Sequence, residues 1–213
     1  MLSAKNIHKY YGGQHVLKGI DLYIKKGEFL CIMGRSGSGK TTLLNILAGM
    51  DSPDVGSITI ENKKLNFAND LEMTKYRRKK LGFIFQFFNL LDNLSLFENV
   101  RIPLLLNKNY NKNYVFEVLE RVGLKGLENK LPAQLSGGEK QRAAIARAII
   151  HKPHIIFADE PTGSLDSETS NQILSLLKGL HSESKVTIIL VTHDDEVASW
   201  SKRILYLSDG VLE

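Results

Sequence analysis

Short apolar runs separated by turn residues characterise both ends of the chain. Up to about residue 32 this pattern predicts strands, with breaks at Gly12-Gly13 and at residues 25–28. Asp209-Gly210 predicts a turn close to the last residue. The remaining runs each fit one strand and cover residues 56–60, 81–85, 155–158, 185–191 and 203–207. Strands are therefore expected to dominate the beginning and the end of the chain.

The middle of the chain shows helical spacing instead. Over residues 114–122 four apolar side chains fall on one helical face, and Gly123 ends the segment. Residues 140–150 and 167–181 also predict helices, and a shorter helix is expected over residues 42–48. Strands alternating with helices indicate an α/β fold.

Residues 87–97 are rich in aromatic and leucine side chains but show no clean periodicity, and Pro103 is expected to break the segment that follows. Two interpretations stay open. The segment could belong to the core, or it could form a partly exposed apolar groove where another protein docks.

Composition adds few constraints. The chain has 213 residues, of which 43% are hydrophobic and 24% charged, as is ordinary for one globular domain. The net charge of +5 is mild, so a solvated surface explains it more simply than an anionic ligand or an acidic membrane face. The basic run Lys75–Lys80 is likewise expected to be a solvated helical face rather than a nucleic-acid or lipid-headgroup patch.

Neither a disulfide nor a membrane span is expected within the chain. Its single cysteine, Cys31, lies inside an apolar strand and is expected to be a buried small hydrophobe rather than a nucleophile, which fits a reducing compartment. No segment resembles a signal peptide or an apolar span, so any role at a membrane is expected to depend on a partner.

The strongest chemical pattern is a glycine-rich loop that fits G-x-x-x-x-G-K-[ST]. It comprises Gly34, Arg35, Ser36, Gly37, Ser38, Gly39, Lys40 and Thr41. The loop follows the apolar run 29–33 and precedes the helix predicted over 42–48, which is the context of a phosphate-binding loop. Backbone N–H groups of such a loop surround a polyphosphate, and the helix N-terminus favours its charge. Lys40 is expected to reach the β- and γ-phosphates and the Thr41 hydroxyl to bind Mg²⁺.

The predicted helix over residues 140–150 is also preceded by residues that suit an anion. Ser136 and Glu139 could form a capping box, which satisfies free backbone N–H groups reciprocally. That role does not explain Gly137 and Gly138, because glycine destabilises a helix unless the backbone must approach something closely. Glycines, a hydroxyl and a helix N-terminus together predict a second anion site.

Acidic and imidazole side chains follow two of the predicted strands. Asp159 and Glu160 end the apolar run 155–158, and His193 follows the strand predicted over 185–191. Ligands in parallel α/β sheets bind beyond the carboxyl ends of strands. Asp159 is therefore a candidate Mg²⁺ ligand, Glu160 a candidate base that polarises water, and His193 a candidate contact to the γ-phosphate.

These motifs give the chain a resemblance to the ATPases of ATP-binding-cassette (ABC) transporters over essentially its whole length. Gly34–Thr41 matches the Walker A motif, Ile155–Glu160 the Walker B motif, and Leu135–Glu139 the signature motif. Single positions match as well. Gln86 matches the Q-loop glutamine, and Asp166 matches the last residue of the D-loop, which covers residues 164–166. His193 matches the switch histidine, and Tyr11 matches the aromatic residue that stacks on adenine. Taken alone, Tyr11 would be a surface tyrosine.

The resemblance implies a P-loop NTPase fold of the α/β class. It has a RecA-like, mostly parallel sheet as its core, an N-terminal antiparallel β subdomain and an inserted α-helical subdomain. Residues 1–213 would form a single ABC ATPase domain. Within it, about 1–70 would be the β-rich part that includes the phosphate loop, about 87–150 the helical subdomain, and 151–213 the part that completes the core.

The same resemblance implies a homodimer with two ATP molecules between the subunits. Each ATP would be held by the phosphate loop, Thr42 and Tyr11 of one subunit and by Ser136–Glu139 and Asp166 of the other. The implied Mg²⁺ ligands are Thr41, Gln86 and Asp159, and the implied catalytic residues are Glu160, His193, Lys40 and Gln86. ATP and Mg²⁺ would be the cofactors.

The implied function is to drive a separate membrane permease that docks near Gln86 to Phe97, at the cytoplasmic face of the cell membrane. The segments Phe85–Leu91 and Pro161–Asp166 are similar to those of macrolide-exporter, lipoprotein-releasing, peptide-resistance and cell-division cassettes. Export or extraction of a lipoprotein, peptide or antibiotic is therefore expected. The alternative is a non-transporting mechanical ATPase of the cell-division type. A role on nucleic acid is not expected, because the chain lacks a coiled-coil insertion or a second fused cassette.

Overall fold

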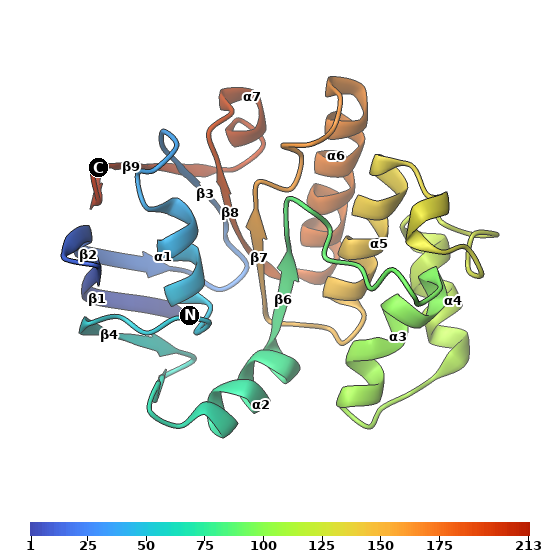
Figure 1. The fold of residues 1–213 in the computed structure, drawn as a ribbon, viewed down its shortest axis with the longest axis horizontal. Helices are drawn as coiled ribbons and strands as arrows, with labels where there is room; N and C mark the ends of the chain where they lie inside the picture. Colours follow the sequence, from blue (N-terminus) through green and yellow to red (C-terminus); the bar gives the residue numbers. More distant parts are fainter.

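Two sheets organise the structure, a computed structural model that describes residues 1–213 (Figure 1). The smaller sheet is antiparallel and has the strand order β2-β1-β4-β5. The larger sheet has the order β10-β9-β3-β8-β7-β6, and its strands run parallel except for β10 at the edge. The strands are β1 (Leu2–Tyr11), β2 (Gln14–Ile24), β3 (Phe29–Met33), β4 (Val55–Ile60), β5 (Lys63–Lys64), β6 (Leu81–Ile84), β7 (Ile155–Asp159), β8 (Thr187–Thr192), β9 (Arg203–Ser208) and β10 (Val211–Leu212).

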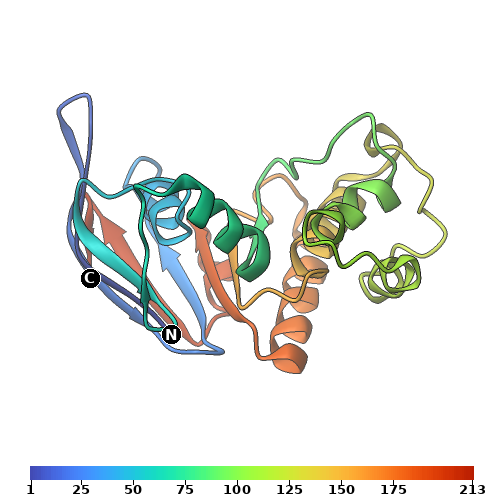
Figure 2. The same cartoon turned by 90° about the horizontal axis from the view of Figure 1, so that it is seen from below.

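The helices divide between the sheet core and a separate helical group. Figures 1 and 2 show α3, α4 and α5 together on the side of the molecule away from β1, β2 and β4. The helices are α1 (Lys40–Leu47), α2 (Asp70–Lys80), α3 (Leu96–Leu106), α4 (Lys112–Arg121), α5 (Gly137–Ile149), α6 (Ser167–Ser184) and α7 (Asp195–Ala198), with a 3-10 turn η1 (Pro132–Gln134) before α5. None of them is both long and apolar enough to cross a bilayer.

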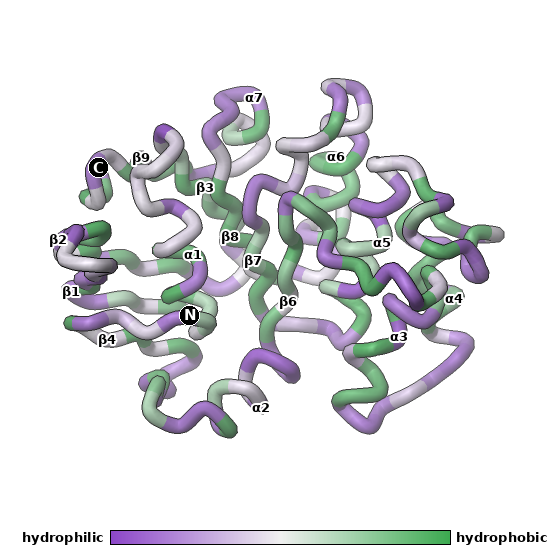
Figure 3. Tube along the Cα trace, viewed as in Figure 1, coloured by the Kyte–Doolittle hydropathy of each residue, from purple (hydrophilic) through white to green (hydrophobic).

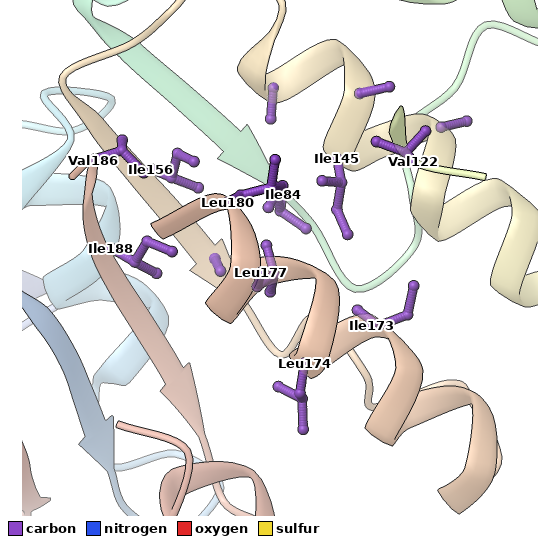
Figure 4. Packing of buried hydrophobic residues seen from close by; sticks show 14 of the residues in the cluster. Ile84, Val122, Ile145, Ile156, Ile173, Leu174, Leu177, Leu180, Val186 and Ile188 are labelled. Atoms are coloured by element: carbon purple, nitrogen blue, oxygen red, sulfur yellow. The ribbon is translucent and has the colours of Figure 1, made fainter. Parts of the chain in front are cut away.

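The large sheet separates two hydrophobic cores because successive side chains of a strand point to opposite faces. On β3, Leu30 and Ile32 join a cluster of 24 buried residues that includes α1 and the small sheet. Cys31 joins a cluster of 29 buried residues that includes α3 to α6. Figure 4 shows part of this second cluster between α6 and the sheet. Strands buried on both faces read as continuous apolar runs, and in Figure 3 β3 and β8 are mostly hydrophobic.

The predicted α/β fold with a mostly parallel sheet, an antiparallel β part and an inserted group of helices is confirmed. The proposed division at about residues 70, 87 and 150 stays a prediction.

Pro103 does not break the segment after residue 97, contrary to expectation. It lies inside α3, and its carbonyl accepts hydrogen bonds from the backbone N–H and side-chain amide of Asn107, at 3.1 and 2.9 Å. The helix tolerates the missing proline N–H because a capping box at Ser95 starts it firmly and because Leu96, Val100 and Leu104 pack into the core.

The strand expected from Lys185 begins two residues later. Lys185 caps the C-terminus of α6 in the left-handed conformation, with φ 54°, and its N–H donates to the carbonyl of His181 at 2.9 Å. The chain needs this turn to leave the helix, so β8 cannot begin before Thr187.

Candidate functional site

Four parallel strands direct the predicted site residues to one edge of the large sheet. β3 leads into the phosphate loop, β7 ends at Asp159, and β8 is followed by His193. Gln86 comes two residues after the end of β6. Because β3, β8, β7 and β6 are neighbours in this order, their carboxyl ends form one continuous site.

The phosphate loop folds around the side chain of Lys40. Its ammonium group is buried and donates hydrogen bonds to the carbonyls of Gly34 and Arg35, at 2.8 and 2.9 Å. The Ser38 hydroxyl is buried and has no hydrogen-bond partner. Gly39, directly before α1, has φ 101°, a conformation that glycine adopts without strain. A buried ammonium, an unpaired hydroxyl and the N-terminus of α1 are donors that fit a polyphosphate.

Oxygen ligands for Mg²⁺ lie beside this loop. The Thr41 hydroxyl donates to the Asp159 carboxylate at 3.2 Å. Burial and the nearby Glu160 raise the pKa of Asp159, in spite of the Thr41 hydrogen bond. No group of three or more His, Cys, Asp and Glu side chains could enclose a metal. One carboxylate and one hydroxyl suit Mg²⁺ that takes its other ligands from phosphate and water.

Glu160 and His193 face each other across the ends of β7 and β8. Their side chains are 3.0 Å apart, from Glu160 Oε1 to His193 Nδ1. Glu160 has φ 43°, which is unusual for a non-glycine residue, and its N–H donates to the carbonyl of Val191 at 3.0 Å. The backbone therefore fixes the position of this carboxylate next to the imidazole.

Gln86 lies close to the segment that follows β7. The Ser164 hydroxyl donates to the Gln86 carbonyl at 3.3 Å. A Cβ atom added to Gly163 would lie 3.1 Å from the Gln86 amide and 3.2 Å from the Glu160 carboxylate. Glycine at 163 therefore keeps these two side chains near each other.

The second helix start does form the capping box. Ser136 N–H donates to the Glu139 carboxylate at 2.7 Å, and Glu139 N–H donates to the Ser136 hydroxyl at 3.2 Å. A Cβ atom on Gly138 would lie 2.7 Å from the Thr169 methyl group, and one on Gly137 would lie 3.1 Å from Leu165. The close approach expected at both glycines thus exists within the chain itself, to the start of α6. The predicted anion site stays a prediction.

Asp166 caps α6 next to this contact. Its carboxylate accepts from the backbone N–H and the hydroxyl of Thr169, at 2.8 and 2.7 Å, and these bonds lower its pKa. Figures 1 and 2 place α5 and α1 on opposite sides of β7 and β6. Within one copy of the chain, α5 therefore lies away from the helix that follows the phosphate loop.

Tyr11 lies at the end of β1, and its ring is half exposed. Its hydroxyl donates to Asp51, and this hydrogen bond, with burial, raises the pKa of Tyr11 to about 12. Lys9 also binds Asp51, at 2.9 Å, and its ammonium lies 5.0 Å from the centre of the Tyr11 ring. The hydroxyl is thus fixed, and the ring stays available for a nucleobase. Thr42 lies in the first turn of α1 and is half-buried.

Arg147 holds the chain after Gln86 and is not among the residues that the sequence predicts for the site. Its guanidinium donates to the carbonyls of Phe88, at 2.8 Å, and Asn89. Both residues have positive φ, 61° and 50°, so the segment is strained. A basic residue within the alanine-rich stretch of α5 is the only sequence signal, and it does not identify a partner 58 residues away.

Comparisons with known proteins agree with this geometry. Residues 17–163 match the family model described as ABC transporter. The chain is 47% identical over 217 residues to the bacitracin export ATP-binding protein BceA of Halalkalibacterium halodurans, covering 99% of this chain and 86% of that protein. It is 43% identical over 219 residues to the lipoprotein-releasing system ATP-binding protein LolD of Legionella pneumophila, covering 100% and 96%.

A solved structure has the same fold. The cassette MJ0796 of Methanocaldococcus jannaschii, in a dimeric post-hydrolysis state bound to ADP and Pi, superposes with a TM-score of 0.91. The two chains are 45% identical, and the match covers 100% of this chain and 97% of that one.

Proposed function

This chain belongs to the ABC transporter family as an ATP-binding and ATP-hydrolysing subunit, and from that premise we propose how its residues divide the work and what it drives. Such subunits act as dimers with a membrane partner. The substrate class that we propose is a lipoprotein, peptide or antibiotic that is exported or extracted from a membrane. The functions for which two relatives are named, bacitracin export and lipoprotein release, support this class. No observation favours the non-transporting alternative.

In the proposed mechanism the phosphate loop binds the triphosphate and orients it. Lys40 exchanges its bonds to the Gly34 and Arg35 carbonyls for the β- and γ-phosphates. Thr41 and Asp159, with Gln86, would hold Mg²⁺, and the ion would supply charge neutralisation on the phosphate oxygens. Tyr11 supports the adenine with the exposed face of its ring.

Glu160 is the proposed base. It orients the attacking water and accepts its proton, a role that typically contributes about 10²–10⁴-fold to the rate. His193, 3.0 Å from Glu160, would turn to the γ-phosphate and stabilise the charge that develops there.

The dimer completes the proposed site. Because α5 and α1 lie on opposite sides of β7 and β6, we assign Ser136–Glu139 at the start of α5, together with Asp166, to the nucleotide of the partner. The N-terminus of α5 would then bind the γ-phosphate of that nucleotide.

The membrane subunit is proposed to dock beside Gln86. A cavity of about 550 Å³ lies between α2, β6, α3 and α5, and Phe85, Pro103 and Leu106 contribute apolar lining. Next to it Phe87 is 75% and Leu91 48% exposed, so the segment after Gln86 adds exposed apolar side chains to this surface. An apolar helix of the permease fits such a groove, which would place the chain on the cytoplasmic face of the membrane.

The observation that carries the proposal is the convergence of Lys40, Asp159, Glu160 and His193 at one sheet edge. Glu160→Gln keeps the shape of the side chain but removes the base. We expect ATP binding to remain, turnover to fall at least about 10²-fold, and a stable dimer to form only with ATP. Steady-state ATPase rates and sedimentation velocity test this, and turnover near wild type would remove Glu160 from the base role. Glu117→Gln, an exposed position on α4, is a matched control away from the site.

A further inference from the structure

A cavity of about 410 Å³ opens at the end of the large sheet opposite the phosphate loop. Its floor is apolar and buried, and it consists of Val118 from α4, Ile156 from β7, Leu180 from α6 and Val186 before β8. Figure 4 shows Val186 and Ile156 at the starts of β8 and β7. The volume falls within the range of small-molecule sites in proteins.

The rim of this cavity is cationic. Lys26, Lys152 and Lys185 line it, are exposed and form no ion pair. Arg121 also lines it but is paired with Glu183, and no Asp or Glu side chain belongs to the lining. Lys152 also lies over the ring of Tyr114, another lining residue, with its ammonium 5.1 Å from the ring centre. Three cations without a carboxylate partner above an apolar floor complement a molecule with an anionic head and an apolar body.

Two of these lysines also have a simpler explanation than ligand binding, namely the capping of helix C-termini. Lys152 follows α5 and Lys185 caps α6, and cations near helix C-termini offset the helix dipole. Lys108 also follows a helix, two residues after the end of α3, and has the same left-handed backbone, with φ 54° against 55° for Lys152 and 54° for Lys185. It lies outside the cavity lining, so it serves as a matched control.

We propose that this cavity binds a small anionic amphiphile. Its carboxylate or phosphate lies among Lys26, Lys152 and Lys185, and its aliphatic or aromatic part lies on the buried floor. The proposed cavity site is separate from the nucleotide site. Ile156 in the cavity floor and Glu160 in the nucleotide site are four residues apart along the chain, and an extended segment of that length spans about 13 Å.

Methyl NMR of the full chain tests the proposal with three probes of equal chain length, namely octanoate, octyl phosphate and the neutral octanol. We expect both anions to shift the methyl signals of Val118, Leu180 and Val186 and to bind at least about fivefold more tightly than octanol. The relative affinity of the two anions distinguishes a carboxylate from a phosphate ligand.

Variants of the lining residues, with one control, show where the probes bind. Lys152→Asn with Lys185→Asn removes two cations while keeping a residue that tolerates positive φ, and it should weaken octanoate binding about fivefold. Lys108→Asn should leave binding unchanged. Ser184→Trp, an exposed position in the lining, should block all three probes. Equal binding of octanoate and octanol, or equal effects of the double variant and Lys108→Asn, would overturn the proposal. Because none of these residues belongs to the proposed ATP site, ATPase activity reports separately on the proposed function.

Discussion

Tyr11 carries two separable properties, a half-exposed ring and a hydroxyl bound to Asp51. Tyr11→Phe removes only the hydroxyl. We expect it to lower the free energy of unfolding by about 1 kcal/mol and to leave ATP affinity unchanged, because the ring remains. Tyr11→Ala should also weaken ATP binding several-fold. Urea unfolding and a fluorescent-nucleotide titration measure the two effects, and weakened ATP binding in Tyr11→Phe would contradict the assigned role of the ring.

His151 makes the stability of the chain depend on pH. Burial lowers its pKa, although its ring donates to the Leu81 carbonyl at 2.9 Å. A histidine whose folded pKa is depressed contributes stability that is fully present above its unfolded pKa of about 6.5 and is lost as the pH falls from there through its lower folded pKa. His151→Gln keeps a donor for Leu81 but does not titrate.

We therefore expect wild type to lose more unfolding free energy than His151→Gln between pH 7.5 and 5.5. Urea unfolding across this range measures the difference. Parallel pH profiles of the two proteins would show that folding leaves the pKa of His151 at its unfolded value.

Residues whose function follows from a local pattern could be predicted from the sequence. Lys40 lies in a strand–loop–helix context that sequence periodicity reveals, and the Ser136–Glu139 cap depends on a four-residue spacing. Arg147 could not be predicted, because its partners, the Phe88 and Asn89 carbonyls, are brought to it only by the packed fold. Gly163 has the same limitation, since its neighbours Gln86 and Glu160 come from two strands.

At the scale of elements, glycine at the start of α5 has two roles. It allows α5 to pack closely on α6, and we propose that it also allows the backbone to approach the nucleotide of the partner. Gly138→Ala would place a Cβ atom 2.7 Å from the Thr169 methyl group and should destabilise the chain by about 1–3 kcal/mol. Thr169→Ser removes that methyl group and keeps the hydroxyl that binds Asp166. The double variant should therefore recover stability.

ATPase activity then separates the two needs. If Gly138 also approaches the nucleotide of the partner, the double variant stays slow although it folds like wild type. Full recovery of turnover would show that this glycine serves only packing between α5 and α6. Thermal unfolding and steady-state ATPase rates on the two single variants and the double variant complete the comparison.

Helix α3 shows why one element escaped prediction. Its apolar residues Leu96, Val100 and Leu104 recur every four positions, and Ser95 with Glu98 forms a capping box. These signals lie among many other apolar residues and before Pro103, which obscured the period. Most strands were predicted because buried parallel strands are continuous apolar runs bounded by turns. The start of β8 was predicted too early because it depends on the cap of α6 at Lys185, and the apolar pattern does not reveal this cap.

At the scale of the whole molecule, Cys31 reports on global unfolding. It is fully buried on β3 between β9 and β8, and burial raises the pKa of its thiol to about 12. Because the thiolate is the reactive form, we expect labelling by a disulfide reagent at pH 8 to be at least about 10³-fold slower than in guanidinium. ADP should slow it further by stabilising the adjacent phosphate loop. Rapid labelling without denaturant would indicate local opening of β3.

Helix α5, a rigid segment of 13 residues, joins two contacts that are about 14 Å apart along its axis. Its first turn packs on α6 through Gly138, and its last turn binds the strained Phe88–Asn89 segment through Arg147. A displacement of that segment by a docked protein would therefore tilt the helix as a unit and carry Ser136 with it. Mechanical force could pass from a membrane to the neighbouring subunit in this way while every strand of the central sheet stays in register.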